Sequence, residues 1–386
     1  MATFEVKVVK VDAIERHPNA DRIELAHIAG YVSIVKRDQV KAGDLVVYIP
    51  ESAVVPQWLL ECIGLWNAER GKGMLAGKAG TRVKAVKLRG VISQGIILQL
   101  HVEHKDHGTG SVIASENEER CVDEGEEVSE FLGITKYVPR IPTCLDGEVC
   151  NVFGETLKFD VENIQKYPGV FKDGEEVIAT EKLHGSWVCY SYVPGLNHPD
   201  LRDGNLIITS KGHSDRGVAF KDNEANTKNK YIQTFNEQEG LFELLKNMAL
   251  KKNTSVYILG EIFGPGIQDL HYGLDSSKFL VFDTYIGEPG SGVYLNYMDL
   301  MSVAHELNLD TVPVLYRGPF DRDKLGKLRD GKETVSGTGA CMREGIVIKP
   351  CIERRDDEIG RAMLKWVSPA YLTRRGKKGQ EITEFN

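Results

Sequence analysis

The hydrophobic pattern of the first third of the chain predicts a series of short β-strands. Apolar and polar positions alternate in brief runs that are separated by turn residues, and strands at this spacing are typical of a small barrel. The expected strands span residues 4–11, 23–28, 32–36, 45–49, 82–88 and 95–100. We therefore expect residues 1–140 to form a β-barrel module of their own.

The pattern changes after residues 139–146, a turn-rich segment with two prolines that marks a domain junction. Two helices are expected beyond it, over 230–250 and over 297–307, and Asn296 is a candidate N-cap for the second. Strand-like apolar runs stand at 177–179, 256–259, 279–282 and 346–348. Helices mixed with nonlocal strands predict an α+β domain over residues 150–386.

Composition is that of a soluble protein with two domains: 386 residues, 41% hydrophobic and 27% charged. No apolar run approaches the roughly 20 residues of a spanning helix, and the N-terminus lacks the apolar region of a signal peptide. The seven cysteines form no Cys-x-x-Cys pair and no zinc spacing. We therefore expect a cytoplasmic protein with reduced thiols and no membrane partner.

The net charge of −8 argues against a protein coated with nucleic acid, but the charges are unevenly distributed. No acidic residue stands between Glu69 and Glu103, whereas that stretch holds seven cations. Such a stretch is either a solvated face or a surface that follows nucleic-acid phosphates. The candidates for phosphate contact are Arg82, Lys84, Lys87 and Arg89.

The tetrapeptide Lys-x-x-Gly occurs four times, beginning at Lys87, Lys105, Lys166 and Lys182. A single lysine is most often a solvated surface charge. Only Lys182 is followed, in order, by the stretches GEIFGPGIQ at 260–268, FLVFD at 279–283, EGIVIKP at 344–350 and LKW at 364–366. This order singles out Lys182 as a candidate nucleophile.

A lysine amine attacks phosphorus only when it is unprotonated, so its pKa must fall from about 10.4. Burial, the nearby cations Lys349 and Lys365, and a bound metal would each disfavour the ammonium form. Glu261 and Glu344 border apolar runs, where a carboxylate could accept a ribose hydroxyl or hold hydrated magnesium. The alternative for each is a strand-end glutamate paired with a surface lysine.

Phe282 is a candidate for stacking on a base or for packing in the core. Strand alternation places residues 280 and 282 on one face and residues 279 and 281 on the other.

The whole series resembles the nucleotidyltransferase motifs of ATP-dependent polynucleotide ligases. Residues 260–268 are similar to the RNA ligase type 2 branch in particular, and residues 17–24 and 43–50 resemble OB-type RNA-binding modules. The resemblance implies the nucleotidyltransferase fold of ligases and capping enzymes, with antiparallel sheets and flanking helices. In the clade it resembles most, this fold follows a small OB-like β-barrel.

The same resemblance implies an ATP-dependent RNA ligase that works with Mg²⁺ or Mn²⁺. Lys182 would form lysyl-AMP, the AMP would pass to a 5′-phosphate, and a 3′-hydroxyl would then displace it. Glu261 and Glu344 would hold the metal. The nucleotide would bind Thr180, Glu181, Lys182, Gly185, Lys211, Glu261, Phe282, Glu344, Lys349 and Lys365. The implied partner is RNA with 3′-OH and 5′-phosphate ends in a nicked duplex, for repair by a monomer.

Three positions depart from the wider superfamily pattern. His184 stands where many members have aspartate, so metal-linked roles of that aspartate do not carry over. Trp366 follows Lys365 in place of a Lys-x-Lys motif, and Lys211 stands where relatives often have arginine, which removes bidentate phosphate contact. The alternatives are a DNA ligase, a GTP-dependent capping enzyme, or a nonenzymatic RNA-binding protein.

Overall fold

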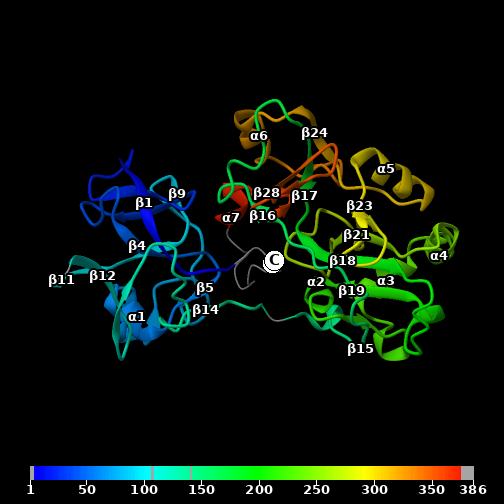
Figure 1. Ribbon diagram of the computed structural model, residues 1–386, viewed down its shortest axis with the longest axis horizontal. Coiled ribbons are helices and arrows are strands. Elements are labelled where there is room, and N and C mark those ends of the chain that lie inside the picture. The colour runs from blue at the N-terminus through cyan, green and yellow to red at the C-terminus, as the bar shows by residue number, and fades with distance from the viewer. Residues whose placement is uncertain (1–3, 106–107, 140, 375–386) are drawn as a thin grey trace.

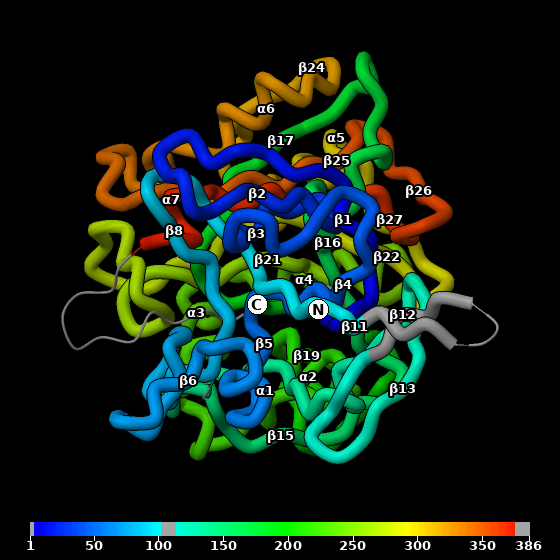
Figure 2. Tube along the Cα trace, turned by 90° about the vertical axis from the view of Figure 1, so that its left-hand side faces the viewer, coloured from blue at the N-terminus to red at the C-terminus, as the bar shows by residue number. Residues whose placement is uncertain are grey.

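The computed structural model describes residues 4–105, 108–139 and 141–374 (Figure 1). The side chain of Lys105, one of the four tetrapeptide lysines, lies outside the described part. Two bodies of the chain lie beside each other along the longest axis, with the N-terminal body in blue and cyan. In Figure 2 the strands of this first body stand in front of those of the second.

The first body is built on a five-stranded antiparallel sheet of order β10-β4-β1-β2-β3. Its strands are β1 (Lys7–Arg16), β2 (Ile23–Ile28), β3 (Tyr31–Lys36), β4 (Leu45–Ile49) and β10 (Ile96–Gln99). The first half of β1 pairs with β4 and its second half pairs with β2, across a register shift between Val11 and Ala13. A bent strand shared between two partners is how a small sheet closes towards a barrel.

Short elements complete this body. They are β5 (Ala53–Val54), α1 (Gln57–Cys62), β6 (Trp66–Asn67), β7 (Lys72–Gly73), β8 (Val86–Leu88), β9 (Val91–Ser93), β11 (His101–Lys105), β12 (Gly108–Ala114), β13 (Glu119–Val122) and β14 (Thr135–Lys136). The strand predicted over 82–88 is wrong for its first half, because Arg82 forms only isolated bridges to Val54 and Ala76. Only β8 remains, and it is exposed along its length.

The second body contains two five-stranded sheets with apolar side chains packed between them. The first has the order β16-β28-β25-β17-β24 and the second β19-β18-β21-β22-β23. Their strands are β16 (Glu162–Asn163), β17 (Glu176–Lys182), β18 (Gly185–Tyr192), β19 (Leu206–Ser210), β21 (Val256–Phe263), β22 (Lys278–Ile286), β23 (Val293–Tyr294), β24 (Val314–Pro319), β25 (Gly345–Pro350) and β28 (Leu364–Val367). Every pairing is antiparallel except β16 with β28.

Helices flank these sheets, and side chains of α3, α4 and α5 pack on the face of the second sheet that turns away from the first (Figure 1). The helices are α2 (Lys211–Ser214), α3 (Lys230–Asn236), α4 (Leu241–Lys252), α5 (Tyr297–Glu306), α6 (Arg322–Leu328) and α7 (Pro369–Leu372). Minor pairs are β15 (Val149–Asn151) with β20 (Val218–Phe220) and β26 (Arg355–Asp356) with β27 (Gly360–Arg361). No helix among the described residues is both long and apolar enough to span a bilayer.

Two helix predictions need correction. The single helix expected over 230–250 is two helices, because the chain turns through Gly240 with a φ of 70° between α3 and α4. Asn296 does precede α5, but its side chain makes no capping hydrogen bond. Its Oδ1 accepts instead from the backbone N–H of Glu353 at 2.8 Å, so it joins two distant segments.

The two bodies meet at the segment that follows β16. Gly30 has a φ of +80°, and a Cβ built on it would lie 1.9 Å from the carbonyl oxygen of Gln165. Beside this contact, Lys166 Nζ lies 3.2 Å from Glu5 Oε2, and Gln165 Nε2 donates to Gln94 Oε1 at 3.4 Å. The barrel body therefore docks closely on this segment, while the expected boundaries at 140 and 150 stay a prediction.

Candidate active site

A pocket opens between the two large sheets of the second body. It is lined by Phe159, Val161, Thr180, Glu181, Lys182, Leu183, Trp187, Lys211, Glu261, Phe282, Val312, Val347, Lys349, Met363 and Lys365. Every predicted nucleotide-binding residue lines it except Gly185 and Glu344. Residues spread over nearly two hundred positions of sequence thus converge on one cavity.

Lys182 is the last residue of β17, and the pairing of this strand with β25 places it opposite Gly345. Glu344 immediately precedes β25, so its carboxylate falls beside the lysine. Lys182 Nζ lies 2.5 Å from Glu344 Oε1, and the Glu344 side chain is only 5% exposed. Glu344 is therefore outside the pocket lining but in direct contact with the candidate nucleophile.

Glu261 lies on β21 opposite Trp187 of β18 and lines the pocket. Burial, and to a lesser extent the charge of Glu344, raises its pKa to about 8 against the opposing charges of Lys182 and Lys211. The carboxylates of Glu261 and Glu344 form an oxygen-donor set suited to Mg²⁺ or Mn²⁺. A divalent cation held between them would offset their repulsion, so these residues fit the expected metal.

The ammonium groups of Lys182, Lys211 and Lys365 line the same pocket. Burial, followed by the charges of Lys182 and Lys211, lowers the pKa of Lys365 to about 8. Burial likewise lowers the pKa of Lys211, whose Nζ lies 2.9 Å from Asp160 Oδ1. Cations that disfavour one another in a pocket provide a site for a polyphosphate, whose charge would stabilise all three.

Lys349 lines the same pocket but is already partnered. Its Nζ lies 3.3 Å from Asp283 Oδ1, and Arg361 donates to Asp283 Oδ2 at 2.6 Å. The predicted phosphate contact of Lys349 therefore stays a prediction, and the structure adds a buried ion-pair network that sequence reasoning did not find.

Phe282 stands at a register shift in the pairing of β21 with β22, where a bulge re-aims a side chain. It is half-buried, and its ring centroid lies 5.4 Å from that of Phe159. Phe159 in turn lies 6.0 Å from Trp187. The predicted alternation is confirmed, because 279 and 281 pack in one cluster while 280 and 282 pack in another.

Sequence reasoning missed Phe159 and Trp187 as pocket residues. For Trp187 the sequence held a usable signal, since strand alternation places it on the same face of β18 as Gly185, a predicted nucleotide-binding residue. Its indole N–H is buried and has no hydrogen-bond partner among the described residues. Phe159 precedes the first motif by more than twenty positions, and nothing in its local pattern marks it.

Glu181 presents one carboxylate oxygen that is already bonded and one that is not. Oε2 accepts from the backbone N–H and the hydroxyl of Thr334 at 2.9 and 2.5 Å, and Arg343 Nε lies 3.8 Å from it. Oε1 is buried without a hydrogen-bond partner among the described residues. A ligand with an N–H group in this pocket would satisfy it.

His184 lies in the turn between β17 and β18, and Gly185 is the first residue of β18, but neither lines the pocket. A Cβ on Gly185 would lie 2.2 Å from the carbonyl oxygen of Ile262 and 2.8 Å from Glu261 Cγ, so the close approach is to β21. Both His184 ring nitrogens are engaged, with Asp269 and with Tyr371 at 2.7 Å each. His184 is therefore not available as a metal ligand.

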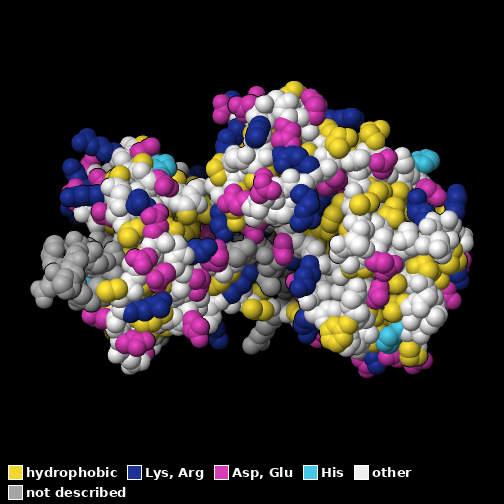
Figure 3. Space-filling model, viewed as in Figure 1, with side chains coloured by type: hydrophobic (Ala, Val, Ile, Leu, Met, Phe, Trp, Pro, Cys, Tyr) yellow, Lys and Arg dark blue, Asp and Glu magenta, His cyan; other side chains and the backbone are white. Residues whose placement is uncertain are grey.

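The predicted nucleic-acid contacts lie on the first body and do not line the pocket. Lys87 and Arg89 are exposed on the hairpin of β8 and β9, and the guanidinium of Arg82 lies 4.2 Å from the centre of the Tyr137 ring. Figure 3 shows dark-blue Lys and Arg side chains of both bodies along the hollow between them. The role of Arg82, Lys84, Lys87 and Arg89 stays a prediction.

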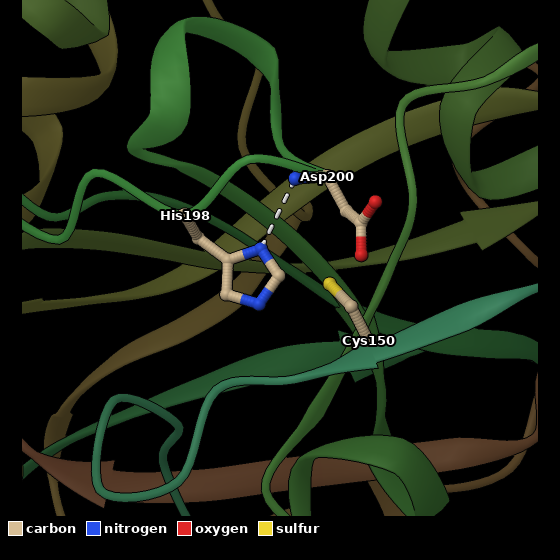
Figure 4. Close-up of side chains that lie close together, drawn as sticks. All are labelled: Cys150, His198 and Asp200. Atoms are coloured by element: carbon tan, nitrogen blue, oxygen red, sulfur yellow. Dashed lines mark hydrogen bonds between the residues drawn. The ribbon is translucent and has the colours of Figure 1, made fainter.

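A second cluster of potential metal ligands lies elsewhere in the second body, at Cys150, His198 and Asp200 (Figure 4). His198 Nδ1 accepts the backbone N–H of Asp200 at 3.2 Å, so the neutral ring carries its proton on Nε2. The carboxylate of Asp200 faces Lys221 Nζ at 3.5 Å. With the imidazole and the carboxylate both engaged, this cluster is not prearranged for a metal.

Comparison with known proteins agrees with this geometry. The model of the RNA ligase family matches residues 175–367, and that of an OB-fold domain matches residues 5–100. No curated protein matches the sequence.

Solved structures of Naegleria gruberi RNA ligase share the fold. A variant without ligand is 24% identical, with a TM-score of 0.70 over 96% of this chain and 98% of that chain. A variant with AMP and Mn is 23% identical, with a TM-score of 0.71 over the same shares of both chains. A third structure, with PPi, is 23% identical, covers the same shares and has a TM-score of 0.70. The OB-fold body followed by a mixed α and β body is thus the architecture of that ligase. Since the family model spans half of its length, this chain belongs to the RNA ligase family.

Proposed function

We propose that this protein is an ATP-dependent RNA ligase that joins 3′-hydroxyl and 5′-phosphate ends through a lysyl-AMP intermediate on Lys182. The observation that carries the proposal is the convergence of Lys182, Glu261, Lys211 and Lys365 on one pocket, with Glu344 in contact with the lysine. If Glu261 and Glu344 were only strand-end glutamates paired with surface lysines, they would not lie together with these residues at a partly apolar cavity.

The first step would be attack of the unprotonated Lys182 amine on the α-phosphorus of ATP. The new P–N bond forms as the bond between the α-phosphorus and the bridging oxygen breaks. Pyrophosphate leaves with the electron pair, and the nitrogen releases one proton to water. Such transfers depend chiefly on positioning and charge neutralisation. Lys211 and Lys365 supply positive charge at the pocket, so we assign them to the phosphates.

Glu261 and Glu344 would hold the divalent metal. When bound, the metal supplies positive charge that weakens the hold of Glu344 on the Lys182 ammonium and neutralises phosphate oxygens. A structure of a Naegleria gruberi RNA ligase variant contains ATP and Mn, which supports the same requirement here.

The base site favours adenine over guanine. Oε1 of Glu181 is a buried acceptor that lacks a partner among the described residues, and it shares the pocket with Phe282. The exocyclic amine of adenine donates to such an oxygen, whereas guanine presents an oxygen at that position and would repel it. This observation supports ATP over the GTP of a capping enzyme.

We further propose that the OB-fold body holds a nicked RNA duplex through Arg82, Lys84, Lys87 and Arg89, and that the protein repairs nicks as a monomer. Phosphate contacts fix orientation without reading sequence. We also propose a cytoplasmic location, as expected for cysteines that form no Cys-x-x-Cys pair and no zinc spacing.

The test is to mix purified protein with ATP or GTP labelled at the α-phosphate, and then to chase the labelled protein with nicked duplexes. We expect label from ATP alone, transfer to a 5′-phosphate RNA end, and a sealed strand. Label from GTP would support a capping enzyme, and sealing of all-DNA nicks alone would support a DNA ligase. Absence of label with bound RNA would leave only a nonenzymatic RNA-binding protein.

A further inference from the structure

A buried hydrogen-bonded chain runs behind the candidate nucleophile and ends in the C-terminal helix α7. His184, only 3% exposed, stands two residues after Lys182. Its Nε2 lies 2.7 Å from Asp269 Oδ1, and its Nδ1 lies 2.7 Å from the hydroxyl of Tyr371. Arg374 closes the chain, since its NH2 group donates to Asp269 Oδ1 at 3.2 Å and its guanidinium lies 3.7 Å from the Tyr371 ring centre.

The donors and acceptors of this chain follow from the state of Asp269. Burial disfavours its ionisation, but hydrogen bonds from His184 and Arg374 outweigh burial and hold the pKa of this carboxyl below its ordinary value. An ionised carboxylate only accepts, so Nε2 of His184 carries a proton and donates. In the neutral ring Nδ1 is then an acceptor, and the hydroxyl of Tyr371 donates a hydrogen bond to it.

The same helix is also tied to the catalytic carboxylate. The backbone N–H of Ser368, which caps α7, donates to the carbonyl oxygen of Glu344 at 2.8 Å. His184 Nδ1 lies 3.9 Å from Glu344 Oε2, and the other oxygen of Glu344 contacts Lys182. Residues 182–184, Glu344 and α7 thus form one closed set of contacts.

We propose that Tyr371 is a positioning residue for Lys182, acting through His184, with Asp269 and Arg374 as its support. The proposal rests on the proposed function of Lys182. Attack on phosphorus depends on the placement of the amine, and a displacement of about 1 Å can cost about a hundredfold in rate. The turn after β17, fixed by the contact of His184 with α7, keeps this placement without contact to ATP.

The kinetic test compares Tyr371→Phe with Tyr190→Phe in the full chain. Tyr190 is a matched control, because it is buried and its hydroxyl bonds Thr234 and the Tyr231 carbonyl. We expect Tyr371→Phe to slow single-turnover adenylation about tenfold at saturating ATP, with an unchanged ATP concentration at half-maximal rate. Tyr190→Phe should lower Tm without this loss. Wild-type rates for Tyr371→Phe, or an equal loss in both variants, would overturn the proposal.

The spectroscopic test needs no nucleotide, so it separates failure of this proposal from failure of the proposed function. Nitrogen-15 NMR of labelled histidines should show His184 as the Nε2–H tautomer in the wild type. Tyr371→Phe should shift its Nδ1 signal towards that of a free acceptor, and Asp269→Asn should disturb the tautomer. An unchanged Nδ1 signal in Tyr371→Phe would show that the hydrogen bond between Tyr371 and His184 does not exist, whether or not ATP labels the protein.

Discussion

At the scale of single residues, Phe282 separates base stacking from simple core packing. It lines the pocket, and a bulge turns it towards Phe159. Leucine keeps apolar bulk but lacks the flat π-face, so Phe282→Leu should weaken ATP use more than it lowers Tm. Adenylation rates against ATP concentration, together with thermal melts, check this. Equal losses of activity and stability would make Phe282 a packing residue.

Glu261 should reduce the stability of the free protein in alkaline solution. Its pKa rises from 4.5 to about 8 on folding, chiefly through burial. Between these values the folded state keeps a proton that the unfolded state releases, so stability falls as pH rises through this window. Glu261→Gln removes the effect, and its Tm should exceed that of the wild type at pH about 8 but not at pH about 5.

Melts in metal-free buffer with a chelator measure this difference directly. A Tm difference of the same size at both pH values would mean that Glu261 is ionised throughout, as an exposed carboxylate would be. Adenylation by the same variant should be lost, because the carboxamide cannot replace a charged metal ligand.

The sequence predicted much of the pocket because the candidate catalytic residues stand in a recognisable order along strands whose pattern is regular. Lys182, Glu261 and Lys365 each belong to a strand, and strand pairing brings them together. Phe159 escaped prediction because its place depends on tertiary packing of a loop. The buried ion pair of Lys349 with Asp283 was not predicted either, since an ion pair between distant strands has no local signature in the sequence.

At the scale of elements, the regular strands were predicted better than the connections. Strands β2 and β4 match their expected spans, whereas the helix over 230–250 is broken and the strand over 82–88 is only partly formed. Apolar alternation indicates which face of an element is buried. The helix break at Gly240 and the isolated bridges of Arg82 depend instead on what packs beside them.

The pairing of β18 with β21 positions Glu261, and Gly185 is the point of closest approach. Because a Cβ there would lie 2.2 Å from the Ile262 carbonyl oxygen, Gly185→Ala should cost about 1–3 kcal/mol of unfolding free energy and displace Glu261. Urea unfolding and adenylation assays check both effects. Gly169→Ala is the control, since its Cβ would meet nothing within 4 Å. Full adenylation by Gly185→Ala would show that Glu261 does not depend on this contact.

At the scale of the whole molecule, we propose that the second body carries out the nucleotide chemistry and that the first orients the duplex. The two are joined tightly at Gly30 and Gln165, so the OB-fold body is held in a defined position relative to the pocket. The resemblance to ligases predicted the two bodies. The contact between them could not be predicted, because the hydrophobic pattern of each body indicates only its own strands and helices.

Charge reversal tests this division of labour. Reversing Arg82, Lys84 and Lys87 to glutamate should leave adenylation intact, reduce nick sealing about tenfold or more, and flatten its salt dependence, since fewer counterions are released on binding. The matched control reverses three exposed lysines of the second body, Lys228, Lys251 and Lys252, with the same change in net charge. Equal sealing defects in both triple variants would indicate a nonspecific charge effect and not a binding surface.

The central claim is that Lys182 carries the nucleotide. Protein incubated with ATP and Mn²⁺ is digested, and mass spectrometry locates the added AMP. Lys166→Ala serves as the control, because Lys166 also begins a Lys-x-x-Gly tetrapeptide but pairs with Glu5. We predict AMP on Lys182 in the wild type and in Lys166→Ala, and none in Lys182→Ala. AMP on another lysine, or labelling that persists in Lys182→Ala, would contradict the account.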